Sequence, residues 1–336
     1  MKRLVSDITI GNFQFNYVTN LSITESWDTF TDTAVISLPN RFRTKDGRQL
    51  IVGDDSIFKR GDAVTIKIGY FPNLETRFQG FISKVIPDSP AVLECEDRMW
   101  LLKQKNITSK TFKKATIKEV VDFAASGETI EYDDPDAVIG GFQIDNRNFV
   151  NAVSVFDTLK KNFGFNIYYR NNVLQVKGLN SIIALNNPIH NIVFQNNVIE
   201  SSLEYIREDD LNIVIKGESI RADNTRIILY GFKQNGDVVV SASEREGELR
   251  SLIKYDLSRS ELESEIRRDI DRFIYEGYSG GFTTFLEPRV EHSDRIDLTD
   301  LKFPERNGRY LISAVETSFG LDGGRQTIGL KNKISV

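Results

Sequence analysis

The sequence has few of the residues that bind metals or cross-link chains. Its 336 residues include one cysteine, Cys95, so no disulfide can form within the chain, and synthesis in a reducing compartment is expected. Its two histidines, His190 and His292, have no second histidine or cysteine at a zinc-like spacing. We therefore expect no metal site and no cofactor, and we expect Cys95 to be a small buried side chain.

Long apolar runs and basic clusters are also missing. The N-terminus turns polar before a signal-peptide core could form, and no segment approaches the roughly 20 apolar residues of a membrane span. The formal net charge is −5, whereas binding nucleic acid without sequence preference requires clustered lysines and arginines. We expect neither Sec-dependent export, nor a membrane span, nor stable nucleic-acid binding.

No catalytic motif is evident either. His292, Ser293 and Asp294 are the residue types of a hydrolase triad, but a triad is assembled from separated elements, so we interpret them as a turn before a strand. Glu94 and Glu96 lie on one face of a predicted strand, which favours a solvated face over a glycosidase carboxylate pair. The chain also has no phosphate-binding glycine loop. We expect a protein that is not an enzyme.

Short alternating runs are abundant instead. Segments such as 60–70 and 77–85 alternate apolar and polar residues and are separated by turn residues. The 22 Phe and 11 Tyr favour sheets. With 40% hydrophobic and 27% charged residues, the composition is that of a folded protein, and the length predicts two or three domains.

Three segments change to helical spacing. Residues 116–119 form a Thr-x-x-Glu capping box ahead of apolar residues at helical intervals. A second helix is expected from about 149–163. The third is expected over 260–277, where Ser260 and Glu263 form another capping box and an apolar stripe follows.

The two ends of the chain resemble each other, which indicates an internal repeat. Three pairs of segments share one offset of 232 residues, as from Asp62 to Asp294; they are 62–66 with 294–298, Phe71-Pro72 with Phe303-Pro304, and Arg77-Phe78 with Arg309-Tyr310. A shift of two residues then aligns 82–85 with 312–315. Any two β-meanders share alternation and turn residues, but a duplicated β-module is the favoured interpretation. Two modules per chain would let a homotrimer present six similar surfaces.

The predicted fold is α+β and mainly β, with two similar tube-like antiparallel β-barrel or meander domains, a small α/β insertion and a helical insertion. The expected boundaries are 1–105 for the first tube-like domain, 106–188 for the α/β insertion, 189–257 and 286–336 for the second tube-like domain, and 258–285 for the helical insertion.

Several stretches, taken in order, resemble the tail hub proteins of contractile phages and related injection systems, the late control protein D family. No single stretch is diagnostic, and the resemblance is strongest toward both ends of the chain. The stretches are 60–70 (RGDAVTIKIGY), 78–82 (FQGFI), 93–100 (LECEDRMW), the capped helix from Ser260, and 308–319 (GRYLISAVETSF).

This resemblance implies a homotrimeric baseplate hub, in which two tube-like domains per chain form a pseudo-six-fold ring at the tip of the tail tube. The implied partners are a spike protein, a tail tube or tube-initiator protein, and a tape-measure protein. The implied location is the virion tail baseplate or an injection particle, after synthesis in the bacterial cytoplasm. In the secretion-system relatives the spike is fused after the hub. Since this sequence ends at Val336, directly after the last predicted strand, we expect a separate spike and no appended lysozyme or peptidase domain.

Two other functions stay open. A glycan- or receptor-binding tail-tip protein is the first, and a tail-associated cell-wall hydrolase is the second. For the hub, we expect ring contacts within the repeated segments 62–85 and 294–315, without a prediction of which face is buried. The residues chosen there are Asp62, Val64, Ile66, Phe78, Phe81, Ile82, Asp294, Ile296, Leu298, Tyr310, Ile312 and Val315.

Overall fold

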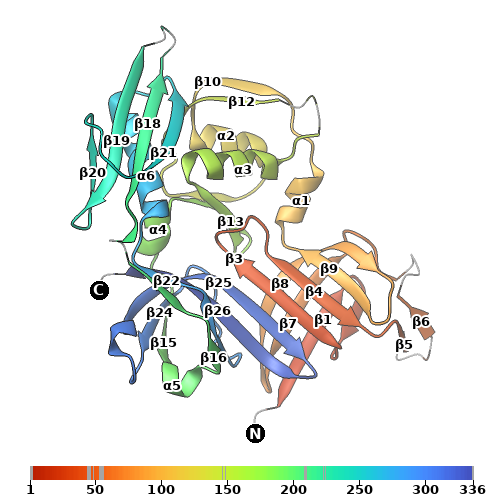
Figure 1. The fold of residues 1–336 in the computed structure, drawn as a ribbon. Coiled ribbons are helices and arrows are strands. Elements are labelled where there is room, and N and C mark those ends of the chain that lie inside the picture. The colour runs from red at the N-terminus through yellow and green to blue at the C-terminus, as the bar shows by residue number, and fades with distance from the viewer. Residues whose placement is uncertain are drawn as a thin grey trace.

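The computed structural model is mostly β, with large antiparallel sheets (Figure 1). A large sheet occupies the lower part of the molecule in Figure 1, and a smaller α/β segment and a separate four-stranded sheet lie above it. Among the described residues, no helix has the length and apolar character needed to cross a membrane. The described residues are 3–43, 47, 49–52, 57–145, 147, 149–207, 210–221, 223 and 225–334.

The first part of the large sheet, here the N-terminal half-sheet, has the strand order β3-β4-β9-β8-β7-β1-β2, and all its pairs are antiparallel. Alternate residues of its strands point into one apolar core, where Ile8, Ile36 and Ile66 are fully buried. The hairpin of β5 and β6 lies beside it. The bounds are β1 Leu4–Ile10, β2 Phe13–Phe15, β3 Asn20–Ser26, β4 Thr33–Leu38, β5 Arg41–Arg43, β6 Gln49–Ile51, β7 Ala63–Tyr70, β8 Asn73–Ile86 and β9 Ala91–Glu96.

The second part, here the C-terminal half-sheet, has the order β16-β23-β26-β25-β24-β15, with β17 and β22 continuing beside β26. Its core includes Phe282, Tyr310 and Ile328. The half-sheets join where β25 pairs with β3, so they form one continuous sheet. The bounds are β15 Ile189–Val193, α5 Phe194–Asn197, β16 Glu200–Ser201, β17 Glu204–Ile206, β22 Gly277–Ser279, β23 Gly281–Thr284, β24 Arg295–Thr299, the 3-10 helix η2 Pro304–Arg306, β25 Gly308–Gly320 and β26 Gly323–Ile334.

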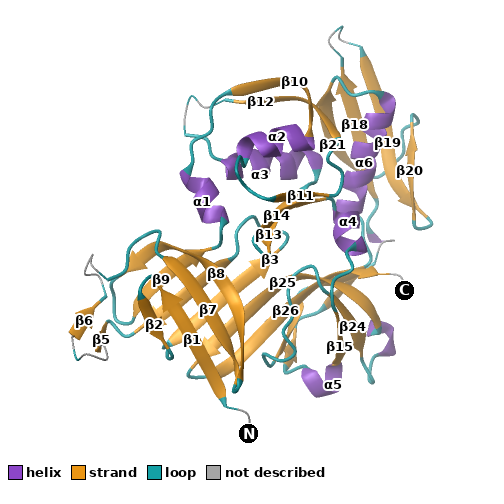
Figure 2. Cartoon of the chain, turned by 180° about the vertical axis from the view of Figure 1, so that it is seen from behind, coloured by secondary structure: helices purple, strands orange, loops and turns teal. Residues whose placement is uncertain are grey.

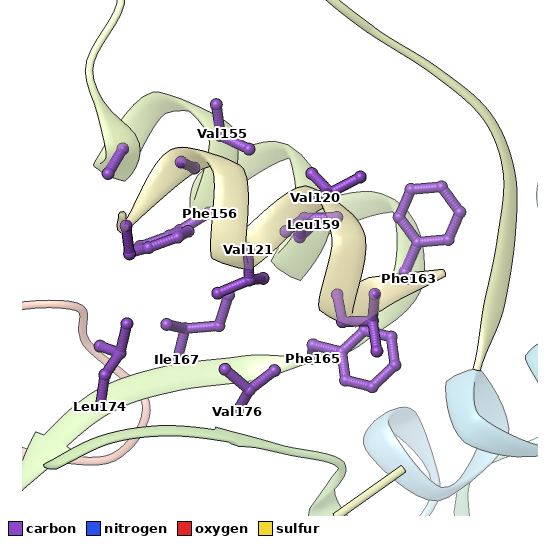
Figure 3. Packing of buried hydrophobic residues seen from close by; sticks show 14 of the residues in the cluster. Val120, Val121, Val155, Phe156, Leu159, Phe163, Phe165, Ile167, Leu174 and Val176 are labelled. Carbon is purple, nitrogen blue, oxygen red and sulfur yellow. The ribbon is translucent and has the colours of Figure 1, made fainter. Parts of the chain in front are cut away.

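The small α/β segment has its own core, in which two helices cover a three-stranded sheet (Figures 2 and 3). Figure 3 shows Val121 and Phe156 directed toward Ile167 of the sheet. The capping box of Thr116 with Glu119 is confirmed. The bounds are α1 Met99–Gln104, β10 Lys110–Thr116, α2 Ile117–Ala124, β11 Ile130–Tyr132, β12 Val138–Ile144, α3 Ala152–Phe163, β13 Asn166–Arg170, β14 Val173–Lys177 and α4 Leu179–Ala184.

A four-stranded sheet, β20-β19-β18-β21, is hydrogen-bonded apart from the large sheet, although residues 189–257 were expected within the second tube-like domain. It is covered by α6, whose Ile266 lies so close to Gly217 and Gly231 that a Cβ at either glycine would overlap it. The apolar stripe of the helix needs a sheet face to cover, and these strands provide it. The bounds are β18 Ile213–Ile220, β19 Arg226–Gln234, β20 Asp237–Ser241, β21 Glu248–Tyr255 and α6 Arg259–Phe273.

Helix α6 begins before the predicted position. Its capping box is formed by Ser258 and Glu261, rather than by Ser260 and Glu263. Both serine and glutamate pairs have the required spacing, so the motif alone does not choose between them. Leu257, fully buried, lies in the core immediately before the capping residue Ser258.

Candidate assembly interface

The seam between β3 and β25 is the contact that joins the two half-sheets. Seven residue pairs lie opposite each other along it, from Ala314 opposite Ser26 to Gly320 opposite Asn20. Alternation directs Ile23 and Phe319 into the core of the N-terminal half-sheet, while Thr24 and Glu316 lie on the other face. The seam is therefore an edge-to-edge sheet junction with one apolar face and one polar face.

Trp27, immediately after β3, anchors the seam. Its indole Nε1 donates to the backbone carbonyl of Ile312 at 2.8 Å, and only 1% of the residue is exposed. Its ring packs with Leu311 of the C-terminal half-sheet and Tyr168 of the α/β segment. The Ser26 hydroxyl adds a hydrogen bond to the carbonyl of Ser313 at 3.0 Å. Trp27 of the N-terminal half-sheet thus contacts both the C-terminal half-sheet and the α/β segment.

A buried arginine supports the same junction. Arg77 of β8 is 3% exposed, and its guanidinium donates to the carbonyl of Leu286 at 2.7 Å and to Gln326 at 3.4 Å. Gln326 in turn donates to the carbonyl of Pro288 at 2.6 Å. These bonds satisfy polar groups that the junction removes from water.

The turns before β7 and β24 have the same hydrogen bonds. In one, Lys59 N donates to the Asp62 carboxylate at 2.8 Å; in the other, Glu291 N donates to the Asp294 carboxylate at 3.2 Å. Each turn has a residue of positive φ, Gly61 and Ser293. The next backbone bonds also match: Gly61 and Asp62 bond with Ile82, as Ser293 and Asp294 bond with Ile312. The corresponding turn residues are 232 positions apart in the sequence, as predicted, and Ile82 and Ile312 are 230 positions apart.

The strands on the other side of each half-sheet also correspond. Thr19 N donates to the Ser37 carbonyl at 2.9 Å, and Ile199 N donates to the Thr283 carbonyl at 2.8 Å. The register across three strands is also the same in the two half-sheets. In the first, Ile36 lies between Leu21 and Leu93; in the second, Phe282 lies between Ser201 and Ile328. Further along, Thr24 lies opposite Thr33 in the first, and Glu204 lies opposite Ser279 in the second. Segment 200–206 therefore corresponds to β3.

Two strand edges have no partner among the described residues. The first is segment 84–86 of β8, which pairs with β9 on one side but extends beyond β7 on the other. The second is the outer edge of segment 200–206, where β16 and β17 pair only with β23 and β22. Unpaired backbone donors and acceptors at such edges are templates for another strand.

Exposed aromatic residues occupy equivalent turns. Phe71, in the turn between β7 and β8, is 66% exposed, and Phe303, in the loop between β24 and β25, is 48% exposed. Leu301 beside Phe303 is also exposed. Because the two turns correspond, each half-sheet presents an exposed phenylalanine at the same position.

A polar cavity of about 250 Å³ lies where the half-sheets meet the α/β segment. Burial raises the pKa of Asp97 to about 7. Burial, with Asp97 nearby, also raises the pKa of Asp32 well above its usual range. Burial and then the charge of Arg170 lower the pKa of His292 to about 3. At mildly acidic pH these three groups are neutral, while four arginines, Arg77, Arg98, Arg170 and Arg289, also line the cavity.

Asp294 connects the C-terminal half-sheet to the α/β segment. Its carboxylate accepts hydrogen bonds from Arg170 at 2.7 Å and from His190 at 2.9 Å. Burial alone would raise the pKa of Asp294, but these two hydrogen bonds hold it below its usual range. Ser293 bonds to Arg170 and to the carbonyl of His292, so the three consecutive residues form the predicted turn and not a catalytic triad.

Most of the residues that the sequence analysis chose as ring contacts are buried within a single chain. Their side chains fill the cores of the two half-sheets, so any contact between copies must use the opposite faces or the edges of the same strands. Asp62 and Phe81 are half-buried, whereas the buried residues are Val64, Ile66, Phe78, Ile82, Asp294, Ile296, Leu298, Tyr310, Ile312 and Val315.

Several solved structures are similar to this chain in fold. A tail protein from Neisseria meningitidis MC58 superposes with a TM-score of 0.70 at 10% identity, over 98% of this chain and 96% of that chain. A 43 kDa tail protein of prophage MuSo2 from Shewanella oneidensis gives 0.62 at 13% identity, over 99% and 97%. This chain has the fold of these tail proteins. A type VI secretion component from E. coli shares the tail-protein fold, with a TM-score of 0.59 at 12% identity, over 98% and 77%.

A scan against protein-family models and a search of curated proteins each gave no match. The similarity to tail proteins is therefore found by comparing structures, at sequence identities of 10–13%. Sequence reasoning missed Trp27 and Arg77 as junction residues. A single tryptophan after a strand and an arginine in an alternating run give no local signal of a distant partner.

Proposed function

We propose that the chain is a structural hub of a phage tail baseplate, or of a phage-derived injection particle. In this proposal three copies form a pseudo-six-fold ring that joins the tail tube to a central spike. The observation that carries the proposal is the equivalence of the two half-sheets. They share strand order, register and turn hydrogen bonds, and they already lie edge to edge within one chain.

Three copies would follow if the seam of β3 with β25 turned one half-sheet by a sixth of a revolution relative to the next. Repeating such a contact between chains would close a ring with two units per chain. Three chains give six units, which match a six-fold tube, and the trimer itself matches a three-fold spike. The equivalent residues Phe71 and Phe303 would then recur six times at one end of the ring, where they offer contacts to six tube or tube-initiator subunits.

A separate spike protein and a tape-measure protein complete the proposed set of partners. The E. coli protein that shares the fold is a component of the type VI secretion system and is similar to tail proteins of bacteriophage T4. A structure of similar fold comes from a Francisella PdpA-VgrG complex, with a TM-score of 0.56. Both are consistent with a protein that works in the virion tail or an injection particle by binding proteins.

A non-catalytic role fits the polar groups. His292 is buried with its Nδ1 unpartnered, Ser293 bonds to a backbone carbonyl, and Asp294 holds Arg170, so none is placed to activate another. Within the described residues, no cluster of three or more His, Cys, Asp or Glu side chains is arranged to bind a metal ion. We infer that the cavity at the junction serves to join the parts of the chain.

The mass of the purified chain in solution tests the proposal. Light scattering is measured over a concentration series, alone and with a candidate spike protein from the same genome. A trimer, or a monomer that becomes a trimer with the spike, supports the ring. A chain that stays monomeric at every concentration and with the spike contradicts it.

One surface favours a second candidate, a glycan- or receptor-binding tail-tip protein. A groove of about 490 Å³ is lined by Phe13, Tyr17 and Phe42 with Asn12 and Gln14, and aromatic faces beside amides are typical of sugar sites. Tyr17 is 53% exposed. Glycan-array binding by the wild type that is lost in Tyr17→Ala would favour this function, whereas no binding by the wild type would contradict it.

A further inference from the structure

The contact within the chain predicts the residues of a contact between chains. Because Asp62 and Ile82 have the bonds of Asp294 and Ile312, segment 84–86 corresponds to 314–316 of β25. Segment 204–206 corresponds to 24–26 of β3 in the same way. Within the chain, 314–316 pairs with 24–26. The two corresponding segments, 84–86 and 204–206, are the unpaired edges described above. Each has the position of one strand of the seam, but neither has the other strand beside it among the described residues.

We propose that segment 84–86 of one copy pairs antiparallel with segment 204–206 of a neighbouring copy. This inference rests on the proposed ring and names its chain-to-chain contact. The register copied from β25 and β3 places Ile86 opposite Glu204, Val85 opposite Tyr205, and Lys84 opposite Ile206.

The faces of the two segments are compatible. Val85 packs against the core of its own half-sheet, and Tyr205 packs against the core of the other, so both lie on the inner face. Lys84 and Glu204 are exposed on the outer face. Pairing therefore continues both apolar cores across the contact and places Lys84 and Glu204 on the outer face, together with the half-buried Ile86 and Ile206.

The charges at the two edges are opposite. A hollow beside segment 84–86 is lined by Lys59, Arg60 and Lys84. Glu200 and Glu204 are exposed on the other edge. In the proposed register Lys84 and Glu204 are diagonal neighbours, a distance that long side chains bridge. Opposite charges favour the edge of a second copy over pairing of either edge with itself.

The contact is expected to be shorter than the seam within the chain. Pro87 follows directly after segment 84–86 and has no N–H to donate, whereas the corresponding position of β25 is Thr317, which continues the pairing. A short contact repeated around a ring is consistent with assembly that a spike strengthens.

A disulfide cross-link tests the register. The variant Ile86→Cys with Glu204→Cys places two cysteines opposite each other between copies, at a Cα separation within the range of disulfides. On oxidation we expect covalent dimers and trimers on a non-reducing gel. The native Cys95 is 1% exposed, and burial raises the pKa of its thiol to about 12, so it does not compete.

Two matched variants control the test. Glu316→Cys with Thr24→Cys carries the corresponding pair inside one chain and should form its disulfide without joining chains. Ile86→Cys with Glu200→Cys is shifted by four residues, roughly 13 Å along a strand, and should link poorly. Equal linking by the shifted pair would overturn the register.

The outcomes separate this contact from the ring itself. A trimer by light scattering that gives no link between copies in Ile86→Cys with Glu204→Cys overturns the strand pairing and leaves the hub proposal standing. A monomer under all conditions, spike included, removes both. Charge reversal gives an independent measurement: Lys84→Glu and Glu204→Lys should each raise the concentration at half-assembly by about threefold or more, and the double variant should restore it. Additive losses in the double variant would contradict the pairing.

Discussion

The two half-sheets of this protein have the same arrangement of central strands and differ in the strands at their outer edges. In both, a turn held by an aspartate leads into a strand and then a long hairpin, and the last strand of the hairpin pairs with a strand from earlier in the chain. In the N-terminal half-sheet β1 runs antiparallel to β7, whereas β15 runs parallel to β24 in the other. The N-terminal half-sheet is built from nearly continuous sequence, while the α/β segment and the four-stranded sheet precede and interrupt the second. The comparison teaches that the shared centre tolerates insertions at its edges.

The half-sheets also differ in how they end. A cluster of phenylalanines, including Phe13, Phe42 and Phe58, closes one end of the N-terminal core. In the C-terminal half-sheet Tyr205, which belongs to segment 204–206, packs on Tyr278, and Tyr278 packs on Tyr310. Tyrosine keeps a polar group near the surface while its ring is buried, which suits an edge that meets another chain.

The largest expected effect comes from breaking the seam that joins the half-sheets. Trp27→Ala removes a fully buried ring and the hydrogen bond to Ile312, and it should lower the free energy of unfolding by about 3–5 kcal/mol. Urea unfolding measures the loss. Trp100→Ala, which removes the other, partly exposed tryptophan, should cost less. Equal losses would show that Trp27 has no special role at the junction.

A smaller effect is expected from two arginines at corresponding positions. Arg77→Met leaves the Leu286 carbonyl without its donor in a buried site and should cost about 2 kcal/mol. Arg309→Met removes a more exposed pair with Asp297 and should cost less than about 1 kcal/mol. Thermal unfolding of both variants measures the difference. A larger loss for Arg309→Met would reverse the comparison.

The junction should also respond to pH. The folded pKa of Asp97, about 7, lies above its ordinary value of 3.8, so the folded state binds the proton more tightly and this group loses stability as pH rises from about 4 to 7. Asp97→Asn stays neutral. It should be more stable than wild type by about 2 kcal/mol at pH 8 and equal to it at pH 4. Glu96→Gln, at the preceding residue, is the control, and a pH-independent difference for Asp97→Asn would contradict the prediction.

The smallest effect on stability is expected at the equivalent turns. Phe71→Ser and Phe303→Ser replace exposed rings and should change the free energy of unfolding by less than about 0.5 kcal/mol. Each should nevertheless weaken binding to a tube or tube-initiator protein, and the double variant should weaken it further. Binding measured by interferometry tests this. Unchanged binding in the double variant would remove these turns from the proposed contact.

Much of the architecture follows from local patterns. Alternation and turn residues predicted the strands of both half-sheets, and Thr116 with Glu119 fixed the start of α2, because these signals depend on near neighbours. The offset between Asp62 and Asp294 also predicted which turns correspond. Residues 189–257 were expected within the second tube-like domain, and strands β18 to β21 among them form a hydrogen-bonded sheet of their own. A strand pattern indicates that one face is buried but does not indicate the partner that covers it.

The sequence by itself determined the mainly β class, the approximate places of helices α2, α3 and α6, and the likeness between the two ends of the chain. Only the tertiary structure decided that β3 meets β25, that Trp27 and Arg77 hold the junction, and that segments 84–86 and 200–206 each have an edge unpaired among the described residues. The physical reason is that alternation and capping act over a few residues. The partner of a strand edge, in contrast, is chosen by shape, register and burial across distant parts of the chain.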